Sequence, residues 1–146
     1  MKPNHRRRAG EQRVWVVFAG RADHLWQRCL RPGFRHCFAA LEDGEGWLVV
    51  DPLSGRLLVT RLDVPSDFDV PGFYRRAGMR AVGPFPLCES ALGQGSGFAP
   101  MSCVGVCRAV LGPHAPFAIT PRGLYRGLVA RLENRKKYLT SRLACG

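Results

Sequence analysis

The sequence predicts an α+β protein, in which an antiparallel sheet of four to five strands comes first and helices pack on one face of it. Three observations lead to this class. Apolar, β-rich runs fill the first part of the chain, charged glycine-containing turns separate them, and two helix signatures follow at the end. With 146 residues, 46% of them apolar, the chain can bury one core. We expect a basic N-terminal tail over 1–12 and a single domain over 13–146.

The strands are predicted from short β-branched and aromatic runs. "RVWVVFA" over 13–19 is the first, and "ADHLWQRCL" after it has the apolar spacing of a short helix over 22–30. "RHCFAALED" and "GWLVVDPL" flank a turn at 43–46, which predicts a hairpin. "GRLLVTRLDV" and "GMRAVGPFP" complete the sheet, with a short helix around 73–76 between them.

Two helices are expected after a Gly- and Ser-rich linker over 89–98. The first runs over 102–111, with Ser102 as its N-cap and Gly112–Pro113 as its stop. The second begins with Thr120 as N-cap and Pro121 in the first helical position. Its core-facing stripe is given by leucines spaced four residues apart, at Leu124, Leu128 and Leu132.

The formal net charge of +11 indicates either a polyanionic partner or a solvated basic surface. The partners that this charge suits are an acidic surface of other proteins or an acidic polymer, either nucleic acid or cell wall. The apolar run behind the basic N-terminus is too short for a signal peptide or a membrane span. We therefore expect a chain that stays in a reducing cytoplasm, with its six cysteines as thiols.

Cys103 opens the first of the two late helices, which makes it a candidate nucleophile. Unpaired backbone N–H groups at a helix start favour a thiolate and can stabilise an oxyanion. Cys107 lies one turn deeper and would lose most of this benefit. The competing interpretation is that both cysteines are small apolar core residues, because free cysteine is among the most buried residue types.

A nucleophilic cysteine needs a base, and His36 is the best placed of the four histidines. It begins a strand, where its ring can project toward a helix packed on the sheet. The hairpin turn returns the end of "GWLVVD" to the start of "HCFAALE", so Asp51 is expected near His36. A carboxylate there could orient the imidazole, although "DPLSG" on its own also fits a simple turn.

These residues resemble the papain-like cysteine hydrolases of the NlpC/P60 type, in which a cysteine opens a helix that packs on an antiparallel sheet. Here "FRHCFAALEDGEGWLVVDP" precedes "SCVGVCRAVLG", an order similar to that of circularly permuted members. These segments, with "TPRGLYRGL", also resemble small proteins of tailed bacteriophages.

The resemblance implies a permuted papain-like fold and a phage-associated hydrolase of amide or peptide bonds, with peptidoglycan peptide as substrate. It implies Cys103 as nucleophile, His36 as base and Asp51 as orienting residue, and no cofactor or metal. It leaves the oxyanion-hole side chain open, with His24 and Gln27 as suggestions. It also implies a place in the host cytoplasm or in a phage particle, with other virion proteins as partners in the particle.

Three alternatives remain at this point. His36, Cys37, Cys103 and Cys107 could converge on zinc, although their spacing lacks the usual Cys-x-x-Cys pair. The basic charge could mark a nucleic-acid-binding module, although most aromatic residues lie in core-like patterns. Finally, the chain could be a structural virion protein of the tail or connector that keeps the papain-like fold while its catalytic role is absent or auxiliary.

Overall fold

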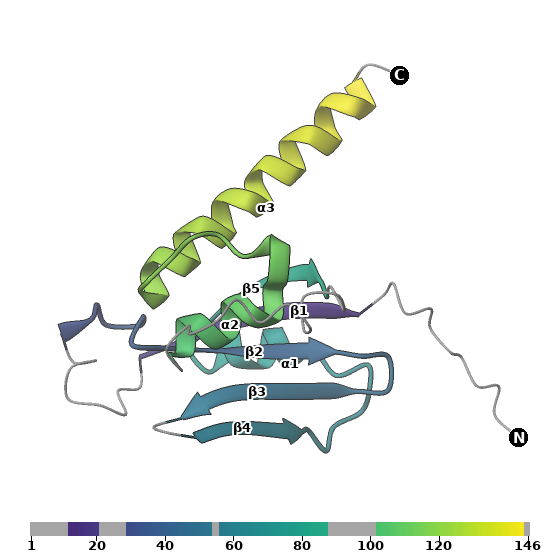
Figure 1. Cartoon of the computed structure of the whole chain (residues 1–146). Helices are drawn as coiled ribbons and strands as arrows, with labels where there is room; N and C mark the ends of the chain where they lie inside the picture. The colour runs from purple at the N-terminus through teal and green to yellow at the C-terminus, as the bar shows by residue number, and fades with distance from the viewer. Residues whose placement is uncertain (1–11, 21–28, 54–55, 88–101, 145–146) are drawn as a thin grey trace, which may run out of the picture.

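A computed structural model describes residues 12–20, 29–53, 56–87 and 102–144, with side chains described through residue 140. Figure 1 shows the sheet at the centre of the molecule, with α3 rising away from it toward the C-terminus. The elements in chain order are β1 (Arg13–Ala19), β2 (His36–Glu42), β3 (Trp47–Leu53), β4 (Arg56–Arg61), α1 (Val70–Arg76), β5 (Arg80–Pro86), α2 (Cys103–Leu111), η3 (Gly112–His114) and α3 (Pro121–Ala144). The α+β class is therefore confirmed.

The described strands form one antiparallel five-stranded sheet in the order β4-β3-β2-β1-β5. The predicted hairpin joins β2 to β3, and its turn is held by Asp43. One carboxylate oxygen of Asp43 accepts the backbone N–H groups of Glu45 and Gly46 at 3.0 and 3.1 Å. Gly44, with φ of 83°, supplies the left-handed conformation that the turn requires.

At β1 and β2 both faces of the sheet are buried, because the side chains of these strands alternate between two apolar clusters. One face carries Val16, Phe18 and Ala39 and packs against α2 and α3. The opposite face carries Trp15, Val17 and Phe38 and packs against α1. The sequence predicted helices on one face of the sheet, and α2 and α3 lie there, whereas α1 covers the opposite face. Strand β1 is almost completely buried because helices pack on both of its faces.

Both late helices begin where their caps predict. The Ser102 hydroxyl accepts the N–H of Gly105 at 3.0 Å, and α2 starts at the next residue. The Thr120 hydroxyl accepts the N–H of Gly123 at 3.1 Å, and α3 starts at Pro121. Leu124 and Leu128 are fully buried, so the predicted stripe faces the core.

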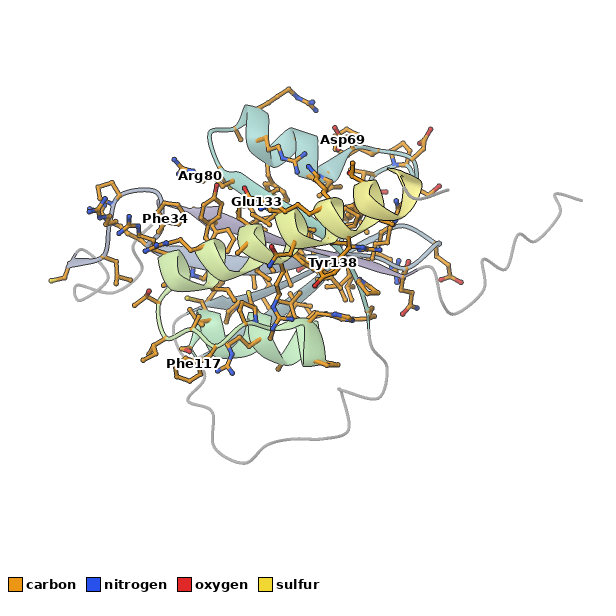
Figure 2. The ribbon with its side chains drawn as sticks, turned by 90° about the horizontal axis from the view of Figure 1, so that it is seen from above. Phe34, Asp69, Arg80, Phe117, Glu133 and Tyr138 are labelled. Carbon is orange, nitrogen blue, oxygen red and sulfur yellow. The ribbon has the colours of Figure 1, made fainter. Side chains whose placement is uncertain are left out.

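Figure 2 views the molecule from above, where α3 appears between α1 on one side and α2 on the other. Near one end of α3, Phe34 packs between Tyr125 and Arg80, whose guanidinium lies 4.8 Å from the Phe34 ring centroid. These contacts tie α3 and β5 to the segment that leads into β2. The start of β2 is thereby fixed relative to the helical layer.

No helix in the described part of the chain is both long enough and apolar enough to span a membrane. Several expectations lie outside the described residues: the basic tail up to residue 11, most of the helix over 22–30 and the linker over 89–98. His24 and Gln27 belong to these undescribed stretches as well.

Candidate functional site

The site lies where the ladder between β2 and β3 ends early. The last described pair is Ala39–Val50, although β3 continues along β4 for three more residues. In the turn, the Asp43 N–H donates to the Gly46 oxygen, so every second pair counted from there is of the hydrogen-bonded kind. The next pair of that kind would join Cys37 to Pro52, and proline has no N–H to donate. Beyond Val50, side chains rather than backbone connect the two strands.

His36 and Asp51 make that connection. The His36 Nε2 lies 2.6 Å from the Asp51 Oδ1, and only 5% of the histidine side chain is exposed. The two residues come from the unladdered ends of β2 and β3, so the pair forms across the hairpin as the sequence predicts. Phe38 packs beside the imidazole on the same face of the sheet. Tyr74 of α1 lies close to Asp51, since burial and the Asp51 charge both raise the pKa of this tyrosine. The imidazole is therefore held in one orientation.

Cys103 reaches the same imidazole from the other layer. It is the first residue of α2, half-buried, and its thiol lies close enough to the His36 side chain and the Cys37 thiol to shift the pKa of His36 and to have its own pKa shifted by both. Asp51 occupies Nε2, whereas Nδ1 is buried without a hydrogen-bond partner among the described residues. Nδ1 is thus the nitrogen that remains for the thiol. The structure brings together all three residues predicted from the sequence.

The charge state of the pair follows from its surroundings. Burial lowers the pKa of His36, but the hydrogen bonds to Asp51 and Cys103 and their negative charges outweigh it and raise that pKa to about 9. For Cys103, the Cys37 thiol and burial raise the pKa above its usual range, against the lowering effect of His36 and the Cys37 backbone N–H. At neutral pH the site therefore holds an imidazolium beside a thiol.

Cys37 is the residue whose role the sequence did not reveal. It is fully buried on β2 and also contacts Cys107, which packs in the core of the α2 face. The pKa of Cys37 is itself raised, because the Cys107 thiol and burial outweigh the lowering effect of Cys103. Only the β2–α2 packing shows that this thiol lies against Cys103. Cys107 is a core residue. The interpretation of both cysteines as small apolar core residues is therefore confirmed for Cys107.

Replacing Cys37 with alanine should increase the reactivity of Cys103 at neutral pH. Removing the neighbouring thiol takes away the largest cause that raises the Cys103 pKa, so more thiolate is present. We expect the alkylation rate of Cys103 by iodoacetamide at pH 7.5 to rise several-fold, measured by peptide mapping. Cys107→Ala is the matched control and should leave that rate unchanged; an equal rise in both variants would show loosened packing instead.

The described residues do not form the zinc site that was considered as an alternative. Among them, no group of three or more His, Cys, Asp or Glu side chains is placed so that it could hold a metal ion. His36 turns its Nε2 toward a carboxylate, and the thiols of Cys37 and Cys107 lie in the apolar core.

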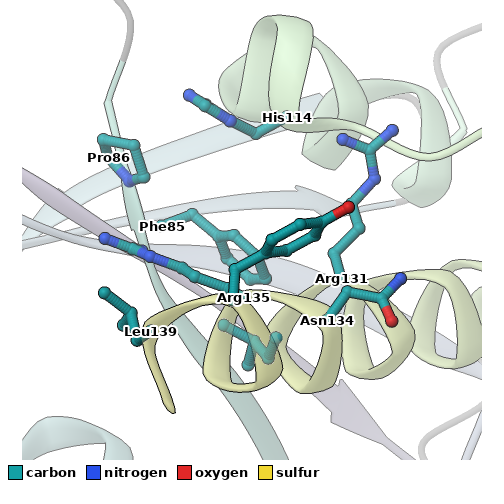
Figure 3. A pocket seen from close by; sticks show the side chains of 9 residues that line it. Phe85, Pro86, His114, Arg131, Asn134, Arg135 and Leu139 are labelled. Carbon is teal, nitrogen blue, oxygen red and sulfur yellow. The ribbon is translucent and has the colours of Figure 1, made fainter. Parts of the chain in front are cut away.

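A separate basic groove of about 820 Å³ lies between the second half of α3, the end of β5 and η3. Figure 3 shows His114, Arg131 and Arg135 around it, with Phe85 and Leu139 forming apolar parts of its wall. No acidic side chain is among the residues that line it; the remaining lining residues are Pro86, Leu132, Asn134 and Tyr138. The groove is thus suited to a negatively charged occupant.

A scan against protein-family models and searches of curated proteins and of solved structures find no match to this chain. The geometry of the site is therefore the basis from which its function is inferred.

Proposed function

We propose that this protein is a cysteine hydrolase of amide or peptide bonds, with Cys103 as nucleophile, His36 as acid and base, and Asp51 as orienting residue. The observation that carries the proposal is one buried imidazole with a carboxylate 2.6 Å from Nε2, an Nδ1 without a partner among the described residues and a helix-start thiol close by. A nucleophile, a base and an orienting group in this order are the arrangement that covalent acyl transfer requires.

The proposed reaction uses the pair after it has lost one proton. The neutral His36 ring takes the thiol proton as the Cys103 sulfur attacks the carbonyl carbon, and the oxygen takes up the electron pair of the C=O bond. The Ser102 hydroxyl takes the N–H of Gly105, and the N–H groups of Cys103 and Val104, which the helix ladder leaves unused, would stabilise that oxyanion. The C–N bond then breaks as His36 gives its proton to the leaving amine, which leaves a thioester on Cys103.

Water completes the cycle. His36, now neutral, takes a proton from water as the oxygen attacks the thioester carbon. The C–S bond breaks, the carboxylic acid leaves, and the sulfur is returned. Asp51 holds the ring through both steps and stabilises the imidazolium. The substrate class that we propose, peptidoglycan peptide, and the association with a phage rest on the resemblance of the sequence segments.

An acyl-trapping experiment tests the chemistry without knowledge of the substrate. The protein is mixed with p-nitrophenyl acetate at about pH 9, near the pKa of His36, and quenched in acid. We expect one acetyl group on Cys103 in the peptide map, and its turnover with time. Acetylation of Cys107 or of exposed Cys29 in preference to Cys103 would overturn the proposed function.

The basic groove supports a second role, that of holding an acidic polymer. Arg131 and Arg135 lie four residues apart on α3, so they present their charges on one side of the helix. Together with His114 they form a cationic rim suited to phosphate or carboxylate groups. This role is compatible with hydrolysis, because it uses none of the three site residues.

Reversing the two groove charges should weaken binding to a duplex DNA probe. We expect Arg131→Glu/Arg135→Glu to lower affinity about tenfold or more and to reduce its salt dependence, measured by fluorescence anisotropy across a NaCl series. Arg126→Glu/Lys137→Glu changes the net charge equally at exposed positions that do not line the groove. An equal loss in both double variants would show that the groove itself is not used.

A further inference from the structure

Strand β4 is an edge of the sheet that no other described element covers. It lies outermost in the strand order, and all six of its residues are exposed. Leu57 and Leu58 are 46% exposed and Val59 is 54% exposed, although consecutive strand residues point to opposite faces. The middle of this strand, Leu57 to Val59, therefore exposes apolar side chains on both faces, between Arg56 and Thr60. Proteins usually protect an edge with lysine, proline or a bulge, and within β4 the protecting charges lie only at its two ends.

The hydrogen-bonding direction of each β4 residue can be derived from one bond. The Leu62 N–H donates to the Trp47 oxygen at 2.9 Å, in the same register as the β3–β4 ladder. Counted from there, every second pair is of the hydrogen-bonded kind, including Asp51–Leu58. Leu58 thus directs its backbone groups toward β3. Leu57 and Val59 direct theirs outward, away from the sheet.

The opposite edge of the sheet, strand β5, is less suited to pairing with an added strand. The Leu87 N–H donates to the Gln12 oxygen at 3.0 Å, which places Pro86 at a position whose backbone nitrogen faces outward. Because proline has no N–H, this end of β5 cannot donate to an added strand. Repeated addition of β4 to β5 of the next copy is thereby disfavoured, and a contact of β4 with itself forms a closed pair.

We propose that two copies of this protein pair through their β4 strands, antiparallel, with Leu58 at the twofold axis. In this register Leu57 lies opposite the partner's Val59, and Val59 lies opposite the partner's Leu57. The outward-facing backbone groups of these residues therefore meet and form hydrogen bonds between the two copies. In this register the Leu58 side chains contact each other across the axis. Arg56 faces the partner's Thr60, so arginines are not placed opposite one another.

Charge sets the conditions for this contact. Arg61, at the end of β4, is 2.6 Å from an Asp43 oxygen and is therefore neutralised within its own chain. The net charge of +11 on each copy still repels the other, so added salt strengthens the pairing. A six-residue strand buries less area than a standard interface, so we expect a weak, reversible dimer. The pairing is independent of the proposed hydrolase site.

Sedimentation velocity of the full chain tests this proposal, from about 10 to 300 µM and with up to about 0.5 M NaCl. We expect a concentration-dependent dimer that NaCl strengthens. Val59→Pro removes an outward N–H and no bond within the sheet, so it should raise the dissociation constant about tenfold or more. Val59→Thr keeps the N–H and should still dimerise. A monomer throughout, or an unaffected Val59→Pro dimer, would overturn the proposal.

A cross-linking pair covers the case in which Val59→Pro fails to fold. Leu58→Cys should form a disulfide between two copies under mild oxidation, because opposed residues of a non-hydrogen-bonded pair have Cα atoms about 4.5 Å apart. Val59→Cys, whose opposed residue is the partner's Leu57, should form far less. Peptide mapping separates this disulfide from one at exposed Cys29. Equal cross-linking of both variants would contradict the register.

Discussion

Cys103→Ala should reduce amide hydrolysis by at least about a thousandfold, to the level of the protein-free control. The sulfur is the atom that forms the thioester, and no second nucleophile in the described site contacts the His36 ring. His36→Ala should lose activity to a similar extent, because nothing else then protonates the leaving amine. The assay is release of soluble amino groups from purified peptidoglycan at about pH 9, near the pKa of His36.

The matched control is Cys107→Ala, which removes a thiol of the same helix from the core without touching the imidazole. It should retain most of the activity. Circular dichroism of every variant separates loss of chemistry from loss of fold. Hydrolysis that survives in Cys103→Ala would contradict the proposed function. If the proposed association with a phage holds, particles carrying Cys103→Ala should assemble normally, and a failure to assemble would favour the structural role instead.

The stability of the protein should fall by roughly 3 kcal/mol between pH 6.5 and pH 9 because of His36 alone. The folded protein binds this proton more tightly than the unfolded chain, since the pKa is about 9 in one and 6.5 in the other. The contribution is complete below pH 6.5 and is lost as the pH rises through 9. Urea unfolding at a series of pH values measures it.

Asp51→Asn provides the control for this pH dependence. The amide keeps the size of the side chain but removes the negative charge that raises the His36 pKa. The fall in stability over the same pH range should become much smaller, while the stability above pH 9 changes least. A wild-type curve that is flat from pH 6.5 to 9 would show that the imidazole is not paired with Asp51 in solution.

The hairpin and the helix starts could be predicted because local interactions determine them. Ser102 and Thr120 cap the helices that follow them, and the Asp43 turn fixes the strand register. That register is sufficient to bring Asp51 to His36. The contact of Cys103 with this pair was predicted only through the assumption that α2 packs over the start of β2.

Two features of the site could not be predicted because they depend on long-range geometry. Pro52 reads as part of a turn in the sequence, and its effect on the β2–β3 ladder emerges only from the alternation of hydrogen-bonded pairs. Cys37 looks like an ordinary core residue of a strand, and only the packing of α2 brings its thiol against Cys103. The face covered by α1 was also missed, because an alternating strand does not show how many layers it serves.

The pH dependence of Cys103 alkylation tests the central claim most directly. Iodoacetamide modification is followed by peptide mapping from pH 6 to pH 10 in the wild type and in His36→Gln. We expect Cys103 to be the first site-lining cysteine to react. Its rate should rise as the pair loses a proton near pH 9, and that rise should disappear in His36→Gln. The same rate profile in both proteins, or earlier modification of Cys107, would contradict the assignment of Cys103 and His36.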